Sequence, residues 1–185
     1  MSGFSASNYK GLGGDDWHVS GTLDIESGGT LTIKDGASLV IEDGALGNTG
    51  VRDSGVITIT NAQLLALNAT PKTLVAAPGA NKALVPVMLL LFHDYATAAF
   101  TVAAGEDLAL KYTDGSGTQI LSVETVGFLD QASDQKRIAP LPTSLLTPTA
   151  NAALVLHMLS GEAADGGGVL YVRVLYRVVD TGFAA

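Results

Sequence analysis

A glycine-punctuated repeat near the start of the chain constrains its fold more than any other feature. Residues 21–44 are three near-copies of one octapeptide, GTLDIESG, GTLTIKDG and ASLVIEDG. Side chains alternate across a β-strand, so the apolar third and fifth positions of each copy share one face and the polar positions between them take the other. A fixed period of this kind predicts short strands separated by glycine turns. The apolar positions are Leu23, Ile25, Leu31, Ile33, Leu39 and Ile41.

The repeat is too short to hide its apolar face within one chain. A single-chain β-solenoid would use residues 21–44 for about one coil, whereas repeat folds need several stacked units. If three chains wind together, each contributes one side of every coil, and the octads stack into a closed prism without free edges. We therefore predict an intertwined β-prism or β-helix over residues 21–62, with the six repeat residues, Ile57 and Ile59 at a homotrimer interface. The alternatives are a β-meander within one monomer and a segment that orders only on assembly.

Composition limits the classes of function. Apolar residues make up 47% of the 185 residues and charged residues only 15%, which indicates that partner subunits cover some apolar surface. The formal net charge is −8, and the few basic residues are scattered, so no nucleic-acid partner is expected. The chain has no cysteine, which excludes thiolate catalysis and cysteine-ligated zinc and is consistent with synthesis in a reducing cytoplasm.

Residues 1–20 are expected to form a flexible arm that orders on a partner's surface, because glycine, serine and asparagine surround single aromatic residues there. The arm lacks the charged start and apolar core of a secretion signal. The longest apolar stretch, residues 83–92, contains Pro86 and is far too short to span a bilayer. A soluble protein without a membrane partner is therefore expected.

Residues 63–185 are expected to form an antiparallel, jelly-roll-like β-sandwich, because strand patterns alternate with turn signals about every ten residues. A hairpin turn is predicted at residues 114–117, DGSG, a polar loop at 130–137 and a turn at 162–168, which holds three consecutive glycines. The expected strands are 72–76, 83–92, 98–102, 107–113, 118–127, 152–159 and 169–179.

The expected last strand, VLYVRVLYRVV, has two different faces. Leu170, Val172, Val174, Tyr176 and Val178 form an apolar inward face. The opposite face carries Tyr171, Arg173, Leu175 and Arg177. That mixture of aromatic, aliphatic and arginine side chains is typical of interfaces, although a solvated face with two arginines guarding the sheet against edge pairing is the alternative.

Catalytic and metal-binding patterns are absent from the sequence. The histidines His18, His93 and His157 lie far apart without companion ligands at metal spacing. The pair Asp15–Asp16 is not followed by the ligand ladder of a calcium loop, and the glycines at 11–14 do not lie between a strand and a helix. We therefore expect no enzyme, no catalytic residue, no metal and no cofactor.

The whole pattern resembles the capsid decoration (cement) proteins of tailed bacteriophages. The resemblance covers residues 21–180 and rests on the octad arm, on LNATPKTLVAAPGANKALVPVMLLLFHDY, on DLALKYTDGSG and on the terminal YVRVLYRVV. It implies a homotrimer on the outer capsid surface that binds and clamps the major capsid protein, and it implies no catalytic residues.

Phe4, Tyr9 and Trp17 are the candidate capsid contacts in the arm, since aromatic residues anchor many interfaces. An acidic protein also avoids repulsion by packaged DNA when it lies outside the shell. Octads of this kind occur in tail fibres and spikes as well, so a tail-fibre or adhesin module that binds a host receptor is the alternative function.

Overall fold

The computed structural model describes residues 8–10, 17–19, 50–140 and 147–182. The chain divides into two compact units, Met1–Ile41 and Glu42–Ala185. In the first unit, β1 (Asn8–Lys10) pairs antiparallel with β2 (Trp17–Val19), and Tyr9 lies opposite His18. The octad repeat lies outside the described residues, so the intertwined β region stays a prediction.

The second unit consists of two antiparallel sheets, which confirms the all-β class and is consistent with a β-sandwich. The first sheet has the strand order β5-β10-β7-β8, and the second has the order β3-β11-β6-β9, with β4 also paired to β11. The strands of the first sheet are β5 (Lys72–Val75), β10 (Leu154–Met158), β7 (Leu108–Tyr112) and β8 (Gln119–Val123). Those of the second are β3 (Arg52–Asp53), β4 (Ile57–Ile59), β11 (Ala164–Asp180), β6 (Lys82–Thr101) and β9 (Gln135–Pro140). The predicted hairpin turn at 114–117 joins β7 to β8, as expected.

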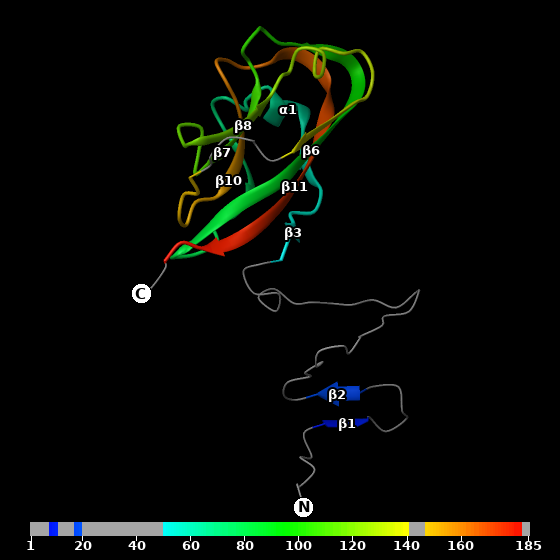
Figure 1. Ribbon diagram of the computed structural model, residues 1–185. Helices are drawn as coiled ribbons and strands as arrows, with labels where there is room; N and C mark the ends of the chain where they lie inside the picture. The colour runs from blue at the N-terminus through cyan, green and yellow to red at the C-terminus, as the bar shows by residue number, and fades with distance from the viewer. Residues whose placement is uncertain (1–7, 11–16, 20–49, 141–146, 183–185) are drawn as a thin grey trace, which may run out of the picture. The chain divides into compact units, whose positions relative to one another are not determined.

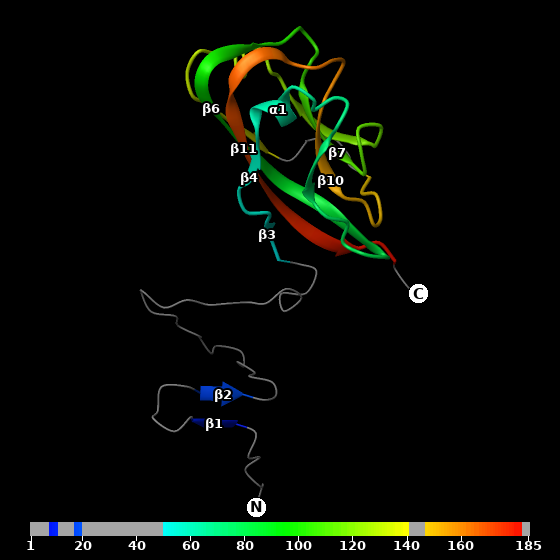
Figure 2. The ribbon, with the colours of Figure 1, turned by 180° about the vertical axis from the view of Figure 1, so that it is seen from behind.

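Two long strands dominate the five-stranded sheet. Strands β6 and β11 pair along nearly their whole length and form two twisted ribbons that curl over at one end (Figures 1 and 2). The expected strands 83–92 and 98–102 are therefore a single strand, and the expected turn at 162–168 is wrong in its second half, because Gly166, Gly167 and Gly168 lie inside β11.

The consecutive glycines are what lets β11 follow the curl of β6. The register shifts between Gly167 and Gly168, a bulge that bends the strand. A Cβ atom on Gly167 would lie 2.2 Å from Thr97 Oγ1, and one on Gly168 would lie 2.6 Å from the carbonyl oxygen of Asp94. Only residues without side chains allow the two backbones to approach this closely.

The sandwich begins before the expected boundary at residue 62. Strands β3 and β4 both pair with β11, and Ser54 strengthens the junction through hydrogen bonds with the backbone of Val174 in both directions, at 3.0 and 2.9 Å. Ile59 is fully buried in the core of its own chain. Ile59 therefore has no surface to offer a sister chain, and its predicted place at the trimer interface is wrong.

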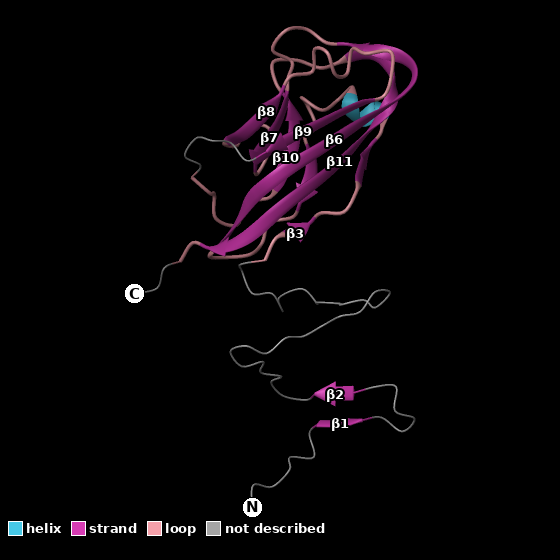
Figure 3. Cartoon of the chain, turned by 45° about the vertical axis from the view of Figure 1, so that its right-hand side comes forward, coloured by secondary structure: helices cyan, strands magenta, loops and turns pink. Residues whose placement is uncertain are grey.

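One further local expectation is corrected, and one short element was not expected. The expected polar loop at 130–137 leads into β9, whose residues pair with β6 from Met88 to His93. A short helix, α1 (Asn61–Leu64), begins at a capping box in which Thr60 Oγ1 accepts from the Gln63 amide and the Gln63 side chain accepts from the Thr60 amide. Figure 3 shows this helix beside the curled end of an otherwise all-strand unit.

The core lies between the two sheets. Leu108, Leu110 and Tyr112 of β7 point inward, as the alternation predicts, and all three are fully buried. The Tyr112 hydroxyl donates a 2.6 Å hydrogen bond to the carbonyl oxygen of Leu84 on β6, which ties the two sheets together. Burial raises the pKa of Tyr112 to about 12.

The outer side of the four-stranded sheet is covered by the chain's own loops. Val155 and His157 of β10 and Lys111 of β7 point away from the core, yet they are only 2%, 8% and 9% exposed. The turn at Gly115 lies over Lys111 and His157: the Lys111 ammonium donates a 2.5 Å hydrogen bond to the Gly115 carbonyl, and a Cβ on Gly115 would meet the His157 ring. The two central strands of this sheet, β7 and β10, are thus buried on both faces.

Candidate interaction surface

The outer side of the five-stranded sheet carries an apolar surface without a cover in the described part of the chain. The register places Lys136 beside Phe92 and Phe92 beside Tyr171 in one row. The next row places Ile138 beside Leu90 and Leu90 beside Arg173. Val56, which lies just before β4, completes this surface. We call the seven residues the open face: Val56, Leu90, Phe92, Lys136, Ile138, Tyr171 and Arg173.

The open face is hollowed and mostly apolar. Its residues line a groove of about 360 Å³. Val56 and Ile138 both line this groove and are each 65% exposed, more than any other large apolar residue of the described chain. Exposed apolar residues that gather around one concave surface mark interaction sites far more often than scattered ones do.

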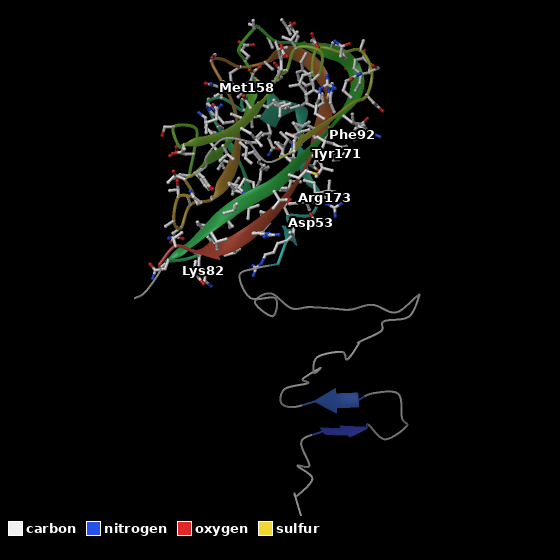
Figure 4. All side chains as sticks on the ribbon, in the orientation of Figure 1. Asp53, Lys82, Phe92, Met158, Tyr171 and Arg173 are labelled. Carbon is white, nitrogen blue, oxygen red and sulfur yellow. The ribbon has the colours of Figure 1, made fainter. Side chains whose placement is uncertain are left out.

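Two aromatic rings and a lysine form the first row of the open face. The rings of Phe92 and Tyr171 stack with centroids 6.0 Å apart and planes inclined by 13°. The Lys136 ammonium lies 5.3 Å from the Phe92 ring centroid, within the range of a cation–π contact. Figure 4 shows Phe92, Tyr171, Arg173 and Asp53 following one another along the β6 and β11 ribbons.

Arg173 is oriented on the open face by an ion pair. Its Nε donates to both carboxylate oxygens of Asp53, at 2.8 and 2.7 Å, and its terminal amino group contacts the same carboxylate. The hydrogen bond from Arg173 lowers the pKa of Asp53, and the same pair raises the pKa of Arg173. An exposed pair adds little to stability, so its main effect is to fix the guanidinium beside the groove.

The structure locates only part of the predicted site. The six repeat residues and Phe4 lie outside the described residues; Tyr9 and Trp17 lie in β1 and β2, where only the backbone is described, so these residues remain predictions. Ile57 is partly buried against the core of its own chain. The predicted two-faced pattern of the last strand is confirmed: Leu170, Val172, Val174 and Val178 are buried, and Arg173 and Arg177 are exposed.

The sequence prediction missed most of the open face. It assigned Leu90 and Phe92 to a buried strand and made no assignment for Ile138, which directly follows the expected polar loop at 130–137. The signal was present in the unbroken apolar run of residues 87–92, because a strand of an antiparallel sheet with one solvated face should alternate instead. Such a run requires a cover on both faces.

The buried histidines serve the fold. His93 points into the core, is fully buried, and packs against Phe100 and Phe128 with ring centroids 5.5 and 6.2 Å apart. Burial lowers the pKa of the imidazole, so the neutral form is favoured. Among the described residues, no group of three histidine, aspartate or glutamate side chains is arranged to hold a metal ion.

Comparison with known proteins adds no family to this description. No protein-family model, no characterised protein and no solved structure matches the chain significantly. No helix in the described part of the chain is both long and apolar enough to cross a membrane. The fold and the surface thus define an all-β protein with an apolar, cation-bearing sheet face.

Proposed function

We propose that the protein is a structural virion protein: a capsid decoration protein that binds as a homotrimer on the outer capsid surface of a tailed bacteriophage and stabilises the shell. In this proposal the octad repeat, residues 21–44, holds the three chains together, and the arm and the sandwich bind the major capsid protein. The protein needs no cofactor and carries out no catalysis. It is made in the host cytoplasm.

The observation that supports a binding role is the open face. A sheet face with Ile138 and Val56 mostly exposed, beside a stacked Phe92–Tyr171 pair, combines the residue types that form the centres of protein interfaces. Exposing such a face to water is unfavourable, so a protein that works without a partner would be expected to carry polar residues there. The octad repeat leads to the same conclusion from a different part of the chain, since it too needs walls from other molecules.

The proposed trimer is also compatible with binding to a shell. Three sister domains engage three equivalent sites, so modest individual contacts add up to tight binding. The net charge of −8 is compatible with the outside of a particle filled with DNA and unfavourable inside it.

The proposal is tested by the mass and the location of the protein. Light scattering on the purified full chain should give the mass of three chains, and Ile33→Asp should give monomers or aggregates, whereas Ile33→Val should keep the trimer. Immunogold labelling of virions should mark heads. A trimeric Ile33→Asp variant would contradict the intertwined repeat, and gold on tails would contradict the decoration role.

A receptor-binding module of a tail fibre or adhesin is the second candidate, and the half-buried aromatic pair beside the groove favours it. Stacked rings such as Phe92 and Tyr171 offer flat apolar surfaces on which a sugar ring could pack. They lie on strands, however, rather than on the loops where a module of this kind is expected to carry its aromatics. Binding to a glycan array that is lost in Tyr171→Ala would support this candidate over the first.

A further inference from the structure

We propose that the open face is the docking site for the octad segment, residues 21–44, of a second copy of this chain. This inference rests on the proposed trimer and deepens it, because it names the surface that covers the apolar side of each repeat. The sister sandwich, rather than the other two octad segments alone, would supply the walls that the repeat needs.

Charge complementarity is the first argument for this occupant. The open face presents Lys136, and the exposed Arg177 lies further along β11, while Arg173 and Asp53 neutralise each other in their ion pair. Packing two open faces together would bring these cations into contact, which disfavours a simple face-to-face dimer. Residues 21–44 carry five carboxylates and one lysine, a net charge of −4, and therefore complement the face.

The apolar pattern is the second argument. Each octad places a leucine and an isoleucine two positions apart on one side of an extended strand, with acidic or hydroxylated residues on the other side. A groove of about 360 Å³ lined by Leu90, Ile138 and Val56 accepts aliphatic side chains of this size. The Leu31–Ile33 pair would enter the groove, and neighbouring acidic residues would reach the cations at its rim.

The position of the octads along the chain is the third argument. The octad segment ends at Gly44, only a few residues before β3, and β3 lies at one edge of the sheet that bears the open face. In extended form, residues 45–51 span roughly 20 Å. When three chains are joined through the repeats, each octad segment is therefore held close to the open faces of its sisters, at a high effective concentration.

The test uses the absence of cysteine from the natural chain. In the full-length protein, Ile138→Cys and Val126→Cys are prepared separately and allowed to react with a maleimide. In the single chain, position 138 is more exposed than position 126, at 65% against 44%. Docking reverses this order: the thiol at position 138 should react at least about tenfold more slowly than the thiol at position 126, since reagents reach a covered thiol only through local opening. Adding Ile33→Asp to Ile138→Cys should restore fast labelling.

Cross-linking identifies the chain that covers the face. Double variants that pair Ile138→Cys with Ile25→Cys, Ile33→Cys or Ile41→Cys are oxidised and run on a non-reducing gel. Covalent dimers and trimers that form from at least one pair, and that do not form when either cysteine is present alone, support docking between chains. Bonds formed only within one chain would overturn docking onto a second copy.

Failure of the inference is distinguishable from failure of the proposed trimer by light scattering on the same samples. Fast labelling at position 138 in a particle with the mass of three chains would overturn the docking site and leave the trimer intact. Fast labelling in a particle with the mass of one chain would overturn both. Slow labelling that persists after Ile33→Asp would show that something other than the octad segment covers the face, and the inference would then be wrong.

Discussion

The chain covers the outer sides of its two sheets to different extents. The four-stranded sheet carries polar residues such as Lys111 and His157 on its outer side, yet its own turn covers them almost completely. The five-stranded sheet carries Phe92, Leu90 and Ile138 on its outer side; in the described chain Phe92 and Leu90 are half-buried and Ile138 is 65% exposed. The described chain thus covers the polar positions of one sheet and leaves apolar positions of the other partly exposed. This difference is the reason for proposing that another molecule covers the open face.

The largest expected effect on stability comes from a substitution on the buried outer side of the four-stranded sheet. Val155→Ser removes apolar volume and places a hydroxyl at a position of the outer side of β10 that is only 2% exposed. We expect the free energy of unfolding to fall by about 2–3 kcal/mol, measured by urea denaturation followed by circular dichroism. A loss below about 0.5 kcal/mol, the range of ordinary surface substitutions, would mean that this position is not buried in the folded chain.

A smaller loss of unfolding free energy is expected for a substitution at the bend of β11 against β6. In Gly168→Ala the new Cβ would lie 2.6 Å from the Asp94 carbonyl oxygen and 2.8 Å from His93 Nε2. The backbones must separate, at a cost of about 1–3 kcal/mol, which a shift in the urea midpoint would report. An unchanged midpoint would show that the curl of the five-stranded sheet does not depend on this close approach.

The hydrogen bond that links the two sheets should contribute still less to the free energy of unfolding. Tyr112→Phe removes the hydrogen bond to the Leu84 carbonyl while keeping the ring, so the expected loss is about 1 kcal/mol. The natural tyrosine should ionise near its raised pKa of about 12, which ultraviolet titration can follow. A titration at the value of a free tyrosine would contradict the burial of Tyr112 between the sheets.

Acidification should destabilise the fold through His93. Because burial lowers the pKa of His93 from the ordinary value of 6.5, the unfolded chain binds a proton before the folded chain does. The contribution of His93 to stability is then full above about pH 6.5 and is lost as the pH falls through and below that value.

His93→Leu should flatten the dependence of the melting temperature on pH between about 7 and 5. His157, whose pKa burial also lowers, accounts for the remaining slope, so His157→Gln is the matched variant. An equally steep fall in His93→Leu would exclude a role for His93.

The smallest effect on folding is expected on the open face. Ile138→Ser makes the same kind of change as Val155→Ser, but at a position that is 65% exposed. The unfolding free energy of the sandwich should stay within about 0.5 kcal/mol of the natural value. A loss as large as that of Val155→Ser would mean that the cover of the open face already belongs to the folded sandwich, and the contrast between the two sheets would disappear.

The class of the fold and the faces of its strands could be predicted because side-chain alternation is a local property. Leu108, Leu110 and Tyr112 point inward as predicted, and so do Leu170, Val172 and Val174. The pairing of β3 and β4 with the C-terminal sheet could not be predicted, because contact with β11 across more than a hundred residues leaves no local mark. The same limit explains the glycine run of β11: three glycines usually signal a turn, and only the approach of β6 makes them part of a strand.

Only two of the seven residues of the open face, Tyr171 and Arg173, could be predicted from the sequence. The side chains of Tyr171 and Arg173 form an interface pattern that is recognisable on one strand, because they alternate with a core face. Phe92 and Ile138 join them only through the pairing of β6 with β11 and β9. The prediction for Ile59 is wrong for a related reason, since its alternation resembles that of the octads although it pairs with Leu170 of its own chain.

The central claim, that another chain covers the open face, is tested most directly by footprinting the natural full-length protein with a short-lived radical label. Val56 and Val126 provide the comparison within one molecule, because the single chain exposes Val56 more, at 65% against 44%. In the assembled protein we predict that Val56 and Ile138 are modified less than Val126. Modification in the order of the single-chain exposures, with Val56 above Val126, would contradict the claim.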